Sequence, residues 1–181
     1  MELVSMGWTS ETHSRLSVSL CLEIVGKLRD DFAKKKMFFS HGSTRLVHYG
    51  DRLSDCAYLI DISEIADHEN FITNEIQNFH SVEPDVLLFH KNKYIQNKVG
   101  TYLAGFPDLV VEIWSTSNGA AERKYKNLVY SSSPTTEHWY FEQNSDFVEM
   151  WLGKNKLGTA PISKKLTTQN GLELDISDIL L

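Results

Sequence analysis

The sequence predicts one domain of the α/β or α+β class, extending over residues 1–181. Its segments follow the order helix, strands, helix, strands, which is typical of a sheet packed against helices. A length of 181 residues and a hydrophobic content of 41% suit one ordinary globular core. Two apolar runs in the middle of the chain, each headed by an acidic residue, indicate buried strands.

The first predicted element is a helix over Ser10 to Phe32. Apolar side chains recur at every fourth position and give this helix one apolar face, formed by Leu16, Leu20, Ile24 and Leu28. Ser10 is the expected N-cap, so His13 would lie in the first turn or so.

Short strands are predicted after this helix. Met37 to Phe39 and Thr44 to Tyr49 flank a turn at Ser40 to Ser43. The segment from Asp51 to Asn70 is acidic and poorly periodic, and within it only Tyr58 to Ile60 indicates a strand.

The two clearest strands are Val82 to His90 and Asp108 to Ser115, joined by a polar link rich in Lys and Asn. A short helix is predicted next, over Asn118 to Tyr130, with Ser117 or Asn118 as its cap.

The remaining residues predict further strands. Glu137 to Glu142 and Phe147 to Leu152 alternate enough to form a hairpin across Gln143 to Asp146. The segment from Gly158 to Leu181 is expected to carry one or two more short strands.

Charge, cysteines and hydropathy limit the function. The formal net charge of −6 does not indicate nucleic-acid binding by itself, although phosphate contacts need only a local basic surface. Cys21 and Cys56 lack the spacing of a metal site, and so do the histidines. No signal-peptide pattern and no run near the roughly 18 apolar residues of a membrane span are present, so a cytoplasmic protein without membrane contact is expected.

Acidic residues of the two clearest strands form the candidate site. Strand alternation would place Asp108, Val110 and Glu112 on one face, where two carboxylates in an apolar run repel each other and are costly to bury. A divalent cation is the usual compensation, and Mg²⁺ and Mn²⁺ favour such oxygen ligands. Asp85 heads the preceding strand, so pairing of the two strands would bring Asp85 and Glu112 to one sheet edge or centre.

The segment from Phe106 to Phe141 resembles the Uma-two family of endonucleases, a branch of the PD-(D/E)XK, or restriction-endonuclease-like, superfamily. Pro107 to Ile113 match the family string Pro-Asp-Leu-Val-Val-Glu-Val, and Ser115 and Ser117 match the Ser-Pro-Ser that follows. The later matches are Glu122, Lys126 and Tyr130 on the predicted helix, then Glu137, His138 and Trp139 on the next strand.

Upstream the resemblance is looser. Glu83 to Val86 is similar to the family's earlier Pro-Asp strand. His13, with the Leu/Ile spacing that follows it, is similar to the family's first helix. Glu2 to Val4 is similar to the end of the family's N-terminal acidic hairpin. The resemblance implies a restriction-endonuclease-like core, with a central mixed β-sheet flanked by helices in the order αβββαβ.

The resemblance also implies the residues of the site. Asp85 and Glu112 would be metal ligands, while Asp108 would bind the metal, directly or through water, or shape the turn. Lys126 would be the catalytic lysine, moved from strand to helix, because Trp114 stands where the simplest superfamily pattern has its lysine. The implied activity is hydrolysis of DNA phosphodiester bonds with Mg²⁺ or Mn²⁺, and a homodimer would suit cleavage of both strands.

Other interpretations stay open. Asp85 could be a turn carboxylate, Glu112 a rim carboxylate paired with Arg or Lys, and Lys126 a solvent-facing lysine with Lys124 as the catalytic rival. Tyr130 is expected to be a packing residue, as is Trp139. Two other functions remain: a nuclease-fold protein that binds or regulates without hydrolysis, and a metal-dependent hydrolase of small phosphodiesters.

Overall fold

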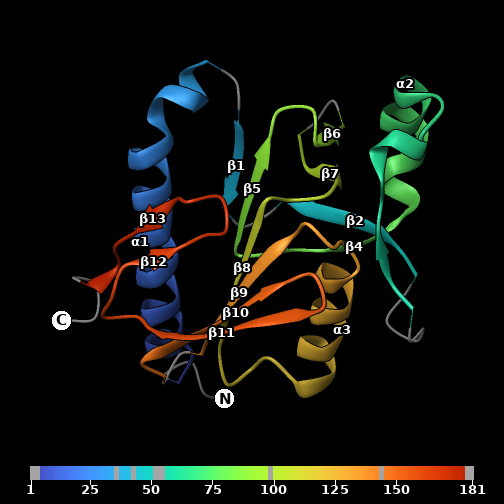
Figure 1. Ribbon diagram of the computed structural model, residues 1–181. Coiled ribbons are helices and arrows are strands. Elements are labelled where there is room, and N and C mark those ends of the chain that lie inside the picture. The colour runs from blue at the N-terminus through green and yellow to red at the C-terminus, as the bar shows by residue number, and fades with distance from the viewer. Residues whose placement is uncertain are drawn as a thin grey trace.

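A six-stranded sheet forms the centre of the protein, with a helix on each face, in the computed structural model (Figure 1). The structure describes residues 5–34, 37–41, 44–50, 56–97, 100–142 and 145–177. The strands, in spatial order, are β1 (Met37–His41), β5 (Val86–His90), β8 (Leu109–Trp114), β9 (Glu137–Glu142), β10 (Phe147–Leu152) and β11 (Asn155–Pro161). The strands β8 and β9 are parallel and the other neighbours antiparallel, so the sheet is mixed, as predicted.

The helix α1 (Ser5–Ala33) covers one face of this sheet, together with a small hairpin of β12 (Leu166–Thr167) and β13 (Glu173–Leu174) (Figure 1). The helix α3 (Ala120–Ser131) covers the other face. Strand alternation divides the core accordingly: in β8, Val111 packs on the α1 side and Val110 on the α3 side.

A second sheet packs beside α3. Its strands are β3 (Tyr58–Leu59), β2 (Arg45–Tyr49), β7 (Tyr102–Gly105) and β6 (Tyr94–Gln96), with β4 (His80–Val82) also paired to β2. Between β3 and β4 the chain forms short helical turns: η1 (Ile62–Glu64), α2 (His68–Asn70), η2 (Phe71–Glu75) and η3 (Ile76–Asn78). The strands β6 and β7 lie in the polar link and were not predicted.

The predicted strand from Val82 to His90 covers the last residue of β4 and all of β5. Pro84 has no backbone N–H to give to a ladder, and the chain leaves the second sheet at Val82 and enters the central sheet at Val86. Asp85 therefore stands directly before β5, at the point where the two sheets separate.

Both helices begin elsewhere than predicted. The helix α1 starts at Ser5 rather than at Ser10, so His13 lies well inside it. The helix α3 starts at Ala120 with Gly119 as N-cap, because Asn118 instead accepts a hydrogen bond from the Ser115 backbone N–H, at 2.8 Å, and closes the preceding turn.

Some expectations concern residues outside the described ranges, among them Glu2 to Val4 and the first two residues of the predicted turn, Gln143 and Asn144. In the part of the chain that the structure describes, no helix combines the length and the apolar character needed to cross a membrane.

The packing of α1 can be tested with two leucines that differ in burial. Leu20 is fully buried in the core, whereas Leu22 is 68% exposed. Leu20→Ala should lower the free energy of unfolding by about 2–5 kcal/mol, because it leaves a cavity. Leu22→Ala should change it by no more than about 0.5 kcal/mol. Urea denaturation measures both, and equal effects would contradict this packing.

Candidate active site

The pairing of β5 with β8 brings Asp85 and Glu112 to neighbouring positions. Val86 lies opposite Val111, so Asp85 comes next to the following residues of β8. Its Oδ2 accepts a hydrogen bond from the backbone N–H of Ile113, at 2.7 Å. The carboxylate of Asp85 is thereby tied to the residue that directly follows Glu112.

Glu112 is buried at the centre of the sheet, with 1% of its side chain exposed. Its Oε2 lies 2.8 Å from Nζ of Lys126, and its Oε1 accepts a hydrogen bond from the hydroxyl of Tyr130. Burial raises the pKa of Glu112 to about 7, even though the Lys126 ammonium acts to lower it. The pairing with Lys126 agrees with the interpretation of Glu112 as a rim carboxylate paired with Arg or Lys. Its burial at the centre of the sheet does not agree with a position at the rim.

Lys126 reaches the site from α3. Its side chain is 11% exposed, and Nζ also donates to the backbone carbonyl of Glu83, at 3.1 Å. The same Nζ lies 5.5 Å from the centroid of the Trp114 ring, within range of a cation–π interaction. Trp114 thus occupies the strand position at which the simplest superfamily pattern has its lysine. The amine of Lys126, carried by α3, lies over the Trp114 ring. Lys124 is exposed, so the structure brings Lys126 rather than its rival to Glu112.

His13 is the third element of the site, from α1. Its Nε2 lies 3.0 Å from Oδ1 of Asp85, and this interaction raises the pKa of His13. His13 was matched to the family's first helix without a role, because a contact between α1 and the start of β5 leaves no signal in local spacing.

Tyr130 was expected to be a packing residue, and it is fully buried beside α3's other apolar side chains. Its hydroxyl nevertheless contacts Glu112. The spacing of Lys126 and Tyr130, four positions apart on one helix, puts both side chains on one face and could have indicated this.

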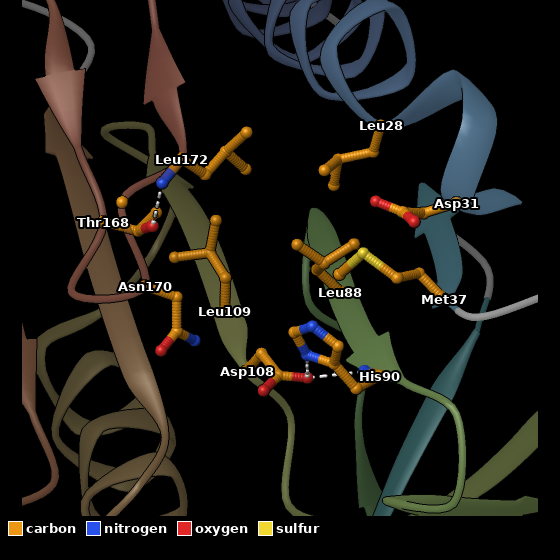
Figure 2. Close-up of a pocket in the computed structure, with 11 residues that line it drawn as sticks. Leu28, Asp31, Met37, Leu88, His90, Asp108, Leu109, Thr168, Asn170 and Leu172 are labelled. Atoms are coloured by element: carbon orange, nitrogen blue, oxygen red, sulfur yellow. Dashed lines mark hydrogen bonds and ion pairs between the residues drawn. The ribbon is translucent and has the colours of Figure 1, made fainter.

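Asp108 lies apart from the other acids. It precedes β8 rather than belonging to it, so strand alternation does not direct its side chain. In the sequence it lies four residues before Glu112. Its oxygens contact Nζ of Lys93 at 2.6 Å and the His90 ring at 2.9 Å. Figure 2 shows Asp108 and His90 together at the edge of a cavity of about 310 Å³ lined by leucines from the α1 side.

The donor set suits a hard cation, although it is small. Asp85 and Glu112 offer carboxylate oxygens at adjacent positions, and Mg²⁺ is often held by one or two carboxylates, with waters and substrate phosphates completing its coordination. Among the described residues, no group of three or more His, Cys, Asp or Glu side chains is arranged to hold a metal ion. Two carboxylates are therefore what this site can contribute.

Comparison with known proteins defines first the fold and then the family. A solved structure entitled a “putative nuclease belonging to DUF820”, from Anabaena variabilis ATCC 29413, is similar with a TM-score of 0.59 at 13% identity, over 94% of this chain and 82% of that chain. The fold is restriction-endonuclease-like, which confirms the predicted class. The chain belongs to the Uma2 family, described as “Putative restriction endonuclease”, whose model matches residues 2–177. No curated protein matches the sequence.

The buried pair makes Lys126 a determinant of stability. Lys126→Met should lower the free energy of unfolding by about 3–5 kcal/mol, because Glu112 then lies buried without a cation. The loss should shrink as the pH falls, since Glu112 can then take up a proton and become neutral. Chemical denaturation at several pH values measures this.

The matched control is Lys124→Met, because Lys124 is exposed on the same helix. It should change stability by no more than about 0.5 kcal/mol. A loss for Lys126→Met no larger than that of the control would show that the pair does not hold Glu112 in the folded protein.

Proposed function

We propose that this protein is a nuclease that hydrolyses DNA phosphodiester bonds with Mg²⁺ or Mn²⁺, using Asp85, Glu112 and Lys126. One observation carries the proposal. The amine of Lys126 lies 2.8 Å from Glu112 at the position next to Asp85, although the strand position of the motif holds Trp114. Two acids and a lysine thus meet from three separate elements, and membership of the Uma2 family supports the same conclusion.

The proposed roles follow from the contacts. When bound, the ion would polarise the scissile phosphate and lower the pKa of the attacking water. Asp85 and Glu112 would hold the ion in their charged forms. Lys126 would orient the water or stabilise the charge that develops on the phosphate, as an ammonium held in a water-poor site can do.

Asp108 is left out of the proposed ligand set. Its carboxylate is engaged by Lys93 and His90, before the start of β8, so a role in holding the same ion is not supported by its position. Its contacts favour the alternative given above, in which it shapes the chain near Pro107.

One observation favours a second candidate, a nuclease-fold protein that binds or regulates without hydrolysis. Each oxygen of Glu112 already contacts a group of the protein: Lys126 on one side and Tyr130 on the other. Binding of an ion has to compete with these contacts or to use the remaining lone pairs. Titration calorimetry with Mn²⁺ separates the two candidates, because the second does not require metal binding.

Cleavage of plasmid DNA with Mn²⁺ tests the leading proposal. Wild-type protein should nick or cut the plasmid, and Glu112→Gln should lower the rate roughly 100-fold or more, since it removes the charge of a ligand while keeping its size. Glu149→Gln is the matched control: Glu149 is also a strand glutamate paired with a lysine, Lys156, but it lies on β10.

Equal rates for Glu112→Gln and wild type, with both proteins purified in parallel, would sink the assignment of Glu112. Duplex DNA, single strands and small phosphodiesters are compared as substrates in the same assay. Faster hydrolysis of the small phosphodiesters than of DNA would make small phosphodiesters, rather than DNA, the proposed substrate class.

A further inference from the structure

The pair of His13 and Asp85 is placed where it contributes little to stability. The His13 side chain is 32% exposed and that of Asp85 is 22% exposed, so water reaches both partners. Ion pairs that remain in contact with water are screened by it and contribute little to stability in most cases. Because Asp85 is a candidate metal ligand, the contact of His13 with its carboxylate calls for an explanation other than stability.

Both oxygens of Asp85 are held, each from a different element. Oδ2 accepts from the backbone N–H of Ile113 in β8, and Oδ1 lies 3.0 Å from His13 Nε2 in α1. The first contact fixes Asp85 beside Glu112. The second fixes the rotation of the carboxylate, because a planar group held at both oxygens has no freedom left about its last bond.

The helix α1 is itself well anchored at this point. Leu16 and Leu20 follow His13 on α1 and are buried in the core against the central sheet. The imidazole is therefore presented to Asp85 by a fixed element rather than by a loop. This is the arrangement in which a hydrogen-bond partner can orient a ligand rather than follow it.

We propose that His13 is a positioning residue of the metal centre: from α1 it holds the Asp85 carboxylate in the orientation that binds the ion, without binding the ion itself. This rests on the proposed function. Carboxylates that bind metals are commonly oriented by such hydrogen bonds, and loss of the partner typically costs about 10–100-fold in metal affinity.

The chain supplies a matched control for this pair. His90 and Asp108 form a second His–Asp contact, with Nδ1 2.9 Å from Oδ2, at the cavity edge shown in Figure 2. Removal of the His90 ring takes away an equivalent pair but leaves Asp85 and His13 untouched.

The test is Mn²⁺ titration calorimetry on the full chain, with circular dichroism to show that each variant is folded. His13→Ala should weaken Mn²⁺ binding about 10–100-fold. His13→Gln should keep an affinity near that of wild type, because its side-chain amide can donate to the same oxygen of Asp85. His90→Ala should bind like wild type. Pulsed electron paramagnetic resonance of the bound Mn²⁺ should show no coupling to an imidazole nitrogen.

Four results would overturn the proposal. Wild-type affinity in His13→Ala would remove the positioning role alone, as would failure of His13→Gln to restore binding in a folded protein. A nitrogen coupling that is present in wild type and lost in His13→Ala would make His13 a ligand instead. Absence of Mn²⁺ binding in the wild type itself would overturn the proposed function, and the role of His13 with it.

Discussion

The burial of one carboxylate, Glu112, is the constraint on which the arrangement of the molecule depends. A charged group in the middle of an apolar strand needs donors close by, and the neighbouring strand residues, Val111 and Ile113, have none to offer in their side chains. The donors come from α3, where Lys126 and Tyr130 lie one turn apart. The position of α3 over β8 is thus fixed by electrostatics as well as by apolar packing.

The second acid owes its place to a break in the chain. The strand predicted from Val82 to His90 is interrupted at Pro84: Val82 pairs in the second sheet, whereas Val86 to His90 form β5 of the central sheet. Asp85 stands at the junction, where β8, α1 and α3 all come near. A site at such a junction receives side chains from several elements, each of which is held by its own part of the core.

Features with a local cause could be predicted from the sequence. The runs that became β8, β9 and β10 are apolar or alternating over six residues, and such patterns depend little on the rest of the chain. The strands β6 and β7 are three and four residues long and are stabilised by pairing with each other and with β2, far away in the sequence. Asp108 shows the same limit, since the start of β8 one residue later removes it from the alternation. The contact of His13 depends on where α1 crosses the sheet, which no spacing encodes.

The division of the acids and the amine between a strand and a helix has a consequence for how such a chain can diverge. In the proposed site the ammonium comes from α3, so the Trp114 position would need no catalytic group. Its ring packs against Tyr140 and lies under the Lys126 amine. Substitutions can then change the sequence of β8 while the acids and the amine keep their positions in space. A search for a lysine two residues after Glu112 would find Trp114 instead, whereas superposition of the Lys126 amine and the Glu112 carboxylate in space would find the pair.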